Sequence, residues 1–165
     1  MAHFEHFTRG DCTSITQHVE RKKDKQGNYL KYKNGQIDTS RSHLNYNLAP
    51  ERQQIDFIKQ RTEELKTLNR KDVNVLCSWI VTAPKTLPEQ YNREFFEQTY
   101  KHLTDMYGEN NVVSAYVHMD ETTPHIHFCF VPVVHDSKKN RDKVSCKECV
   151  TQLDLKKFHP NLQKS

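Results

Sequence analysis

Hydrophobic residues along the chain follow two different periods, which change from segment to segment. Strands are predicted where the apolar run is short or alternates with polar residues: residues 2–8, 73–82, 112–118 and 125–134. Helices are predicted where apolar residues recur at helical spacing: residues 13–23, 50–69 and 88–107. Pro50 can open the second helix, and Gly108 can end the third. The polar and basic residues 137–149 predict a loop, and a last helix begins at Thr151 and is interrupted at Pro160.

This order of elements favours an α+β sandwich, in which two long helices lie beside a mainly antiparallel sheet. The 165 residues fit one domain, so we treat residues 1–165 as a single unit. Only 35% of the residues are hydrophobic, which predicts a thin core. The net charge of +4 suits a nucleic-acid partner without establishing one.

The location of the protein is predicted from what its sequence lacks. It contains no apolar run of the ~20 residues that span a bilayer, so no membrane contact is expected. The first residues lack the apolar core of a secretory signal, which favours the cytoplasm. Five cysteines, an odd number, do not suggest a disulfide framework. Cys146 and Cys149 form a lone Cys-x-x-Cys pair, which we interpret as reduced thiols rather than a zinc site.

A basic segment with two turn signals lies between the first two predicted helices. It contains Tyr29 and Tyr32 between Gly27-Asn28 and Asn34-Gly35. The tyrosines are available to stack on bases. Four lysines of the segment are candidates for binding DNA phosphates: Lys22, Lys23, Lys31 and Lys33. The alternative interpretation is a solvated surface loop.

The segment 118–127 carries three histidines and two acids. A strand ends at His118, a turn containing Pro124 follows, and another strand begins at His125, which predicts an antiparallel hairpin. Because side chains alternate along a strand, His125 and His127 face the same way, and His118 can join them across the ladder. The residues between and after them face the core: Ile126, Phe128 and Phe130.

Three neutral imidazoles with open positions make the kind of site that a catalytic metal needs. Asp120 and Glu121 lie in the turn, where a carboxylate can orient a histidine or act as a base. The residue types alone do not fix the metal, since imidazole suits several transition metals and an open site near phosphate could take manganese.

Three motifs resemble those of the Mob/Pre relaxases, the MobV class of the HUH endonucleases. Residues 118–127 resemble the third motif of that family, and residues 38–46, Asp-Thr-Ser-Arg-Ser-His-Leu-Asn-Tyr, resemble the second. Residues 17–21, Gln-His-Val-Glu-Arg, occupy the place of the first motif. The motifs come in family order and cover nearly the whole chain.

The resemblance implies a relaxase-like antiparallel sheet of about five strands flanked by helices. It implies an enzyme that nicks one strand of a plasmid transfer origin, single-stranded or in a hairpin, and stays joined to the 5′ phosphate. The three histidines would hold a divalent cation, Mn²⁺ first and Mg²⁺ second. The family's C-terminal region, through which oligomers are expected to form, is absent from this sequence.

The resemblance also assigns roles to residues outside the histidine cluster. His18 would be the nucleophile that forms a phosphohistidine, and Glu121 would take its proton or orient it. Arg21, Arg41 and Asn45 would bind DNA or stabilise charge. A neutral histidine is common at cellular pH, whereas a tyrosine, with a pKa near 10, would need more help from a base or metal.

Several alternatives remain open at this point. Tyr46 could be the nucleophile instead, as in a rolling-circle replication initiator or a transposase of the same superfamily. The protein could also be a DNA-binding module in which a metal only stiffens the hairpin. A metal hydrolase of small molecules would need a closed apolar pocket, and the basic segment argues against it.

Overall fold

An antiparallel sheet forms the centre of the molecule. The computed structural model describes residues 1–30 and 36–164, with side chains through residue 158, and within these residues the main sheet has five strands in the order β1-β3-β5-β4-β2. Every neighbouring pair is antiparallel. The strands are β1 (Ala2–Thr8), β2 (Tyr46–Asn47), β3 (Asn74–Thr82), β4 (Val112–His118) and β5 (His125–Phe130). The predicted α+β class and the sheet of about five strands are therefore confirmed.

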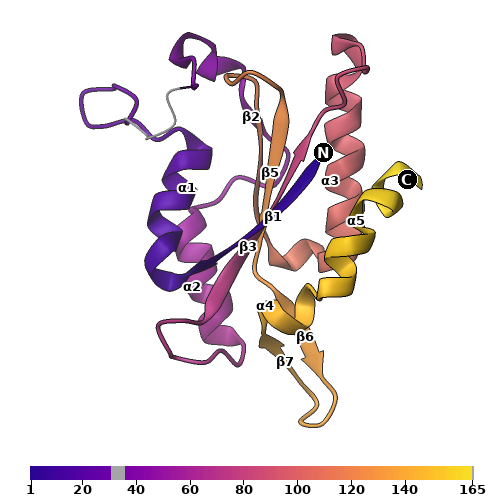
Figure 1. Ribbon diagram of the computed structural model, residues 1–165. Coiled ribbons are helices and arrows are strands. Elements are labelled where there is room, and N and C mark those ends of the chain that lie inside the picture. Colours follow the sequence, from indigo (N-terminus) through magenta and orange to yellow (C-terminus); the bar gives the residue numbers. More distant parts are fainter. Residues whose placement is uncertain (31–35, 165) are drawn as a thin grey trace.

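Helices cover both faces of this sheet (Figure 1). Helices α1 (Cys12–Glu20) and α2 (Gln54–Glu64) lie on one face, and α3 (Asn92–Tyr107) and α5 (Gln152–Lys164) lie on the other. Short 3-10 turns connect the larger elements: Arg9–Asp11, Thr39–Leu44, Glu89–Tyr91 and Glu109–Asn111. No helix in the described part of the chain combines the length and apolar character that crossing a membrane requires.

The two faces of the sheet carry different side chains because residues alternate along each strand. Ile126, Phe128 and Phe130 of β5 belong to the larger apolar cluster, on the α3 side. Aromatic stacking strengthens this side, with Phe158 against Trp79 at a centroid distance of 3.9 Å. His125 and His127 therefore point toward the α1 side.

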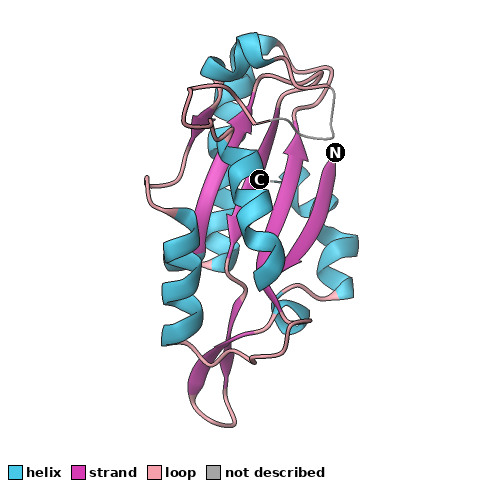
Figure 2. Ribbon diagram, turned by 90° about the vertical axis from the view of Figure 1, so that its left-hand side faces the viewer, coloured by secondary structure: helices cyan, strands magenta, loops and turns pink. Residues whose placement is uncertain are grey.

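One strand prediction and one loop prediction are wrong, both at the end of the molecule that carries a small hairpin (Figure 2). Residues 125–134 were expected to form one strand, but β5 ends at Phe130 and β6 (Val133–Asp136) begins a separate sheet. Pro132 lies at the break and has no N–H to donate to a ladder. Residues 137–149 form β7 (Arg141–Val144) and α4 (Cys146–Cys149) rather than a loop.

Helix ends also differ from the sequence prediction. Helix α1 ends at Glu20 rather than at residue 23, because Arg21 adopts a left-handed conformation with φ 54°. Helix α2 covers Gln54–Glu64 rather than residues 50–69. Helix α5 runs through position 160 instead of stopping there. All five cysteines are free thiols, and the Sγ atoms of Cys77 and Cys146 are 3.1 Å apart.

Candidate active site

The hairpin of β4 and β5 brings together the three histidines that the sequence singled out. His118 and His125 are directly opposite each other, and His127 is two residues further along β5. Their ring centroids are 4.6 to 5.2 Å apart. One nitrogen from each ring lies within 4.8 Å of the others, so the three can share a cation. The expected convergence of imidazoles on one face is present.

Hydrogen bonds to backbone carbonyls fix the ring orientation of two of these histidines. The Nε2 atom of His118 lies 2.8 Å from the carbonyl oxygen of Val19, and the Nδ1 atom of His125 lies 2.8 Å from that of Thr123. Since a carbonyl oxygen only accepts, each of these nitrogens carries the hydrogen. The opposite nitrogen of His118, Nδ1, then has a lone pair, which is what a metal ligand needs. The opposite nitrogen of His125, Nε2, faces the Glu121 carboxylate at 3.2 Å.

Burial keeps His118 and His127 neutral and leaves one nitrogen atom of each without a partner. Desolvation, followed by the nearby Arg21 charge, lowers the pKa of His118 to about 3. Desolvation and the neighbouring His118 hold the pKa of His127 well below its ordinary value. Among the described residues, the buried Nδ1 atoms of His118 and His127 have no hydrogen-bond partner. Buried unpartnered nitrogens are costly in a protein alone, so this cluster fits a divalent cation.

His18 lies beside this cluster. It projects from α1, is half-buried, and its ring centroid is 6.3 Å from that of His118 and 6.2 Å from that of His127. Burial, followed by the charge of Arg21, lowers the pKa of His18. The imidazole of His18 is therefore unprotonated at cellular pH.

Tyr46 lies on the other face of the sheet. It is directly opposite Val117 in β4, and opposed residues in antiparallel strands share a face. That face packs against α3, whose Arg93 guanidinium lies 4.5 Å from the centre of the Tyr46 ring. Burial also raises the pKa of Tyr46. The sheet thus separates Tyr46 from the three histidines.

Arg21 is buried in the structure, although we expected it to bind DNA. Its guanidinium donates to both carboxylate oxygens of Asp120 at 2.9 and 3.0 Å, and to Glu121 at 3.1 Å. It also donates to the carbonyl oxygen of His18 at 2.7 Å. With its side chain only 4% exposed, Arg21 makes its contacts within the protein, and it ties the end of α1 to the β4–β5 turn.

Asp120 organises the site through more contacts than the sequence indicated, since the sequence suggested only that a carboxylate in this turn could orient a histidine or act as a base. Besides Arg21, its carboxylate accepts hydrogen bonds from Ser42 at 2.7 Å and Asn45 at 2.9 Å. Asn45, expected to bind DNA, also accepts a bond from the backbone N–H of Met119. Burial alone would raise the pKa of Asp120, but these hydrogen bonds outweigh it and hold that pKa well below its usual range. The three motifs therefore meet at one carboxylate.

Glu121 connects this network to the histidine cluster. Its Oε1 atom accepts from Arg21, and its Oε2 atom lies 3.2 Å from Nε2 of His125. The other expected DNA-binding residues lie at the surface: Lys22, Lys23 and Arg41 are exposed. The Lys23 ammonium lies 4.7 Å from the centre of the Tyr29 ring. Lys31 and Lys33 fall outside the described residues.

Comparisons with known proteins agree with this arrangement. The family described as Mob_Pre, plasmid recombination enzyme, matches residues 1–165. A plasmid recombination enzyme of Lactiplantibacillus plantarum is 34% identical over 131 residues, which are 74% of this chain and 36% of that protein. Another, of Streptococcus agalactiae, is 35% identical over 141 residues, which are 79% of this chain and 27% of that protein. The chain therefore spans 27% to 36% of the length of these relatives.

A solved structure has the same fold. The MobM relaxase domain, bound to oriT DNA of plasmid pMV158 in a manganese-bound crystal, superimposes with a TM-score of 0.81 and 31% sequence identity. The match covers 99% of this chain and 83% of that domain.

Proposed function

Because the chain belongs to the Mob_Pre family of plasmid recombination enzymes, we propose that it is the DNA-nicking domain of a relaxase. The domain would cut one strand of a plasmid transfer origin, single-stranded or in a hairpin, in the cytoplasm. The observation that carries this proposal is the placement of His18 beside three buried imidazoles on one face of the sheet.

His118, His125 and His127 are the residues that would hold a divalent cation. When bound, this cation would supply positive charge to the oxygens of a DNA phosphate. Mn²⁺ is the first choice because the similar MobM domain was crystallised with it, and Mg²⁺ is the alternative. The unpartnered nitrogens and the depressed pKa values of His118 and His127 support this ligand set, because a ligating imidazole must be unprotonated.

His18 is the proposed nucleophile. A lone pair of its neutral ring attacks the phosphorus, a P–N bond forms, and the bond from phosphorus to the 3′ oxygen breaks. The leaving 3′ oxygen takes a proton from solvent. Because the new P–N bond makes the remaining ring N–H of His18 more acidic, the Glu121 carboxylate accepts that proton. The lowered pKa of His18 supports this role because a nucleophilic imidazole must be unprotonated.

Arg21 and Asp120 are proposed as positioning residues rather than DNA ligands. Arg21 holds the carbonyl oxygen of His18 and the carboxylate of Asp120 at the same time. This bridge fixes the distance between the nucleophile on α1 and the hairpin that carries the metal ligands. Phosphate binding would fall to exposed cations such as Lys22, Lys23 and Arg41.

The alternative nucleophile, Tyr46, is disfavoured by its place on the opposite face of the sheet. A non-catalytic DNA-binding module would not need a half-buried neutral histidine next to the ligand cluster.

The test is nicking of a supercoiled plasmid that carries the transfer origin of the chain's own genetic element. We expect open circles with Mn²⁺ or Mg²⁺, no product with a chelator, and no product from His127→Ala. His135→Ala is the matched control, because His135 is exposed and pairs with Asp142 in the small hairpin. Cleavage in the chelator would refute the metal-dependent mechanism, and no cleavage with any divalent cation would favour the binding module.

A further inference from the structure

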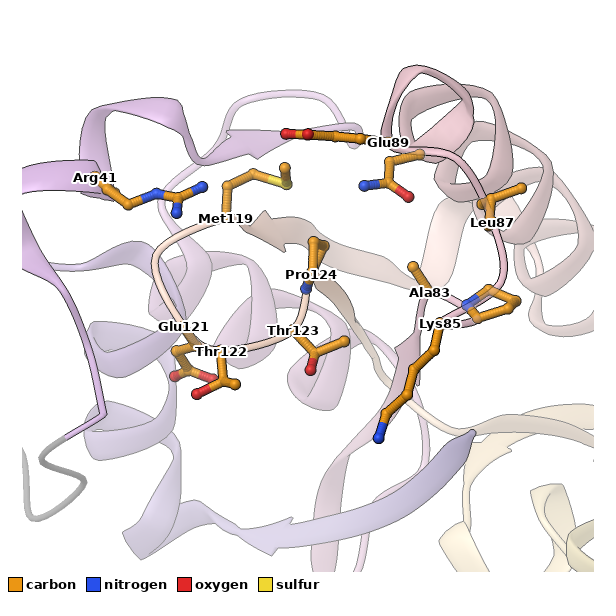
Figure 3. Close-up of a pocket in the computed structure, with 12 residues that line it drawn as sticks. Arg41, Ala83, Lys85, Leu87, Glu89, Met119, Glu121, Thr122, Thr123 and Pro124 are labelled. Atoms are coloured by element: carbon orange, nitrogen blue, oxygen red, sulfur yellow. The ribbon is translucent and has the colours of Figure 1, made fainter.

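A groove lies next to the proposed active site, on the α3 side of the β4–β5 turn (Figure 3). Its volume is about 260 Å³, somewhat smaller than the pockets that take drug-sized ligands. Arg41, Met119 and Glu121 lie on one side of it and Ala83, Lys85 and Leu87 on the other, with Pro124 between them. A cavity of this size suits one small ring system rather than a helix or a peptide.

Asn92 gives this groove a specific polar contact. The residue is the first of α3, lines the groove and is only 8% exposed. Its side-chain amide makes no hydrogen bond to any residue that the structure describes. An amide at the groove that uses neither its donor nor its acceptor within the described protein is available to pair with a ligand.

The remaining lining matches the chemistry of a nucleotide. Met119, Leu87 and Pro124 offer apolar surfaces to a flat ring. Arg41 and Lys85 are exposed, and neither forms an ion pair with a described residue, so both are available to phosphates. The exposed Glu89 carboxylate at the rim can accept a hydrogen bond from an exocyclic amino group.

Glu121 connects this groove to the metal-site histidines. It lines the groove, and its Oε2 atom is 3.2 Å from Nε2 of His125 on the other face of the hairpin. A strand whose phosphate lies at the histidine cluster would therefore pass over the turn and bring a neighbouring nucleotide to the groove.

We propose that this groove is a nucleobase pocket, in which Asn92 reads the edge of one unpaired base next to the scissile phosphate. This inference rests on the proposed nicking function. An asparagine amide can form two hydrogen bonds with the edge of adenine. The Glu89 carboxylate would also favour a base with an exocyclic amino group. Adenine is therefore the expected base.

The test is selection of a single-stranded DNA pool with a randomised centre by the full chain with Mn²⁺. The chain carries His18→Ala, so that binding is selected without cleavage. We expect one position with a marked preference for adenine, and Asn92→Ala in the same background should reduce that preference roughly fivefold or more. Asn92→Asp, which loses the donor but keeps an acceptor, should shift the preference toward cytosine. Preferences at other positions should remain.

Gln98→Ala is the matched control, since Gln98 is exposed on the same helix. Thermal unfolding of each variant checks that a lost preference is not lost folding, and Asn92→Asp provides a second readout if Asn92→Ala is unstable. Unchanged base preferences in both Asn92 variants would overturn the pocket and leave the nicking function intact. Retention of DNA without any base preference would likewise overturn the pocket alone. If the chain with intact Asn92 retains no DNA from the pool, the DNA-binding function itself fails, and the pocket fails with it.

Discussion

At the scale of single residues, Asp120 is a buried carboxylate that three separate parts of the chain contact. Arg21 follows α1, Ser42 lies in the turn at Thr39–Leu44, and Asn45 precedes β2. The carboxylate is 1% exposed, so its charge depends on these donors. Removing the charge would leave the Arg21 guanidinium buried with Glu121 as its remaining acidic partner.

We expect Asp120→Asn to lower the free energy of unfolding by about 3 kcal/mol at neutral pH. The pKa of Asp120 is depressed in the folded state, so its stabilisation is present above its unfolded pKa of about 3.9 and is lost as the pH falls toward the lower folded value. The difference between wild type and variant should therefore shrink below about pH 3. Urea unfolding across this range measures it.

Asp105→Asn is the control, because Asp105 is exposed and pairs with Lys101 on the surface of α3. A deficit of Asp120→Asn that stays constant from neutral to acid pH would mean that ionisation of Asp120 does not stabilise the fold.

The histidine cluster could be predicted from the sequence, but its supporting contacts could not. Alternation within one hairpin is a local pattern, so residues 118–127 were enough to place the three imidazoles on one face. The partners of Asp120 are 75 to 99 residues away in the chain. Local patterns carry no information about such pairs, so the contacts of Arg21 and Asn45 with Asp120 were not predicted.

At the scale of elements, strong turn and cap signals were predicted well, and weakly apolar segments were not. Gly108 ends α3 as expected, with a positive φ of 92°. Strand β7 escaped prediction because three of its four residues are charged, namely Arg141, Asp142 and Lys143. Helix α1 was extended too far because nothing local indicates that Arg21, a non-glycine residue, turns left-handed to reach Asp120.

Gly108→Ala should destabilise the protein by at least about 1 kcal/mol, because side chains rarely adopt its φ of 92°. An added Cβ would also lie 3.0 Å from the Asn111 amide nitrogen. Thermal unfolding measures the loss. Gly10→Ala is the control, since a Cβ there would meet only the Thr8 hydroxyl, at 3.8 Å. Equal stability of the two variants would show that the α3 cap does not depend on glycine.

At the scale of the whole molecule, the sheet separates two kinds of chemistry. The α3 side holds the larger apolar cluster and Tyr46, while the α1 side holds the histidines and His18. The exposed cations Lys22 and Lys23 follow α1 directly, close in the chain to His18. Because the net charge is only +4, we expect the placement of these cations, more than the total charge, to direct DNA to this side.

Binding of single-stranded DNA should therefore weaken with salt, and each removed cation should lower the slope of log K against log salt by about 0.7. Lys22→Ala and Lys23→Ala are the variants, measured by fluorescence anisotropy over a salt series. Lys101→Ala on α3 is the matched control and should leave the slope unchanged. If all three variants share one slope, DNA does not approach from the α1 side.

The covalent link to His18 is the central claim, and mapping the protein–DNA adduct tests it most directly. The protein is incubated with Mn²⁺ and a single-stranded oligonucleotide of its own transfer origin, digested, and analysed by mass spectrometry at neutral to alkaline pH. We predict a nucleotide joined through its 5′ phosphate to the peptide that contains His18. This adduct should be retained in Tyr46→Phe and absent in His18→Phe. An adduct on Tyr46, or one that persists in His18→Phe, would contradict the account.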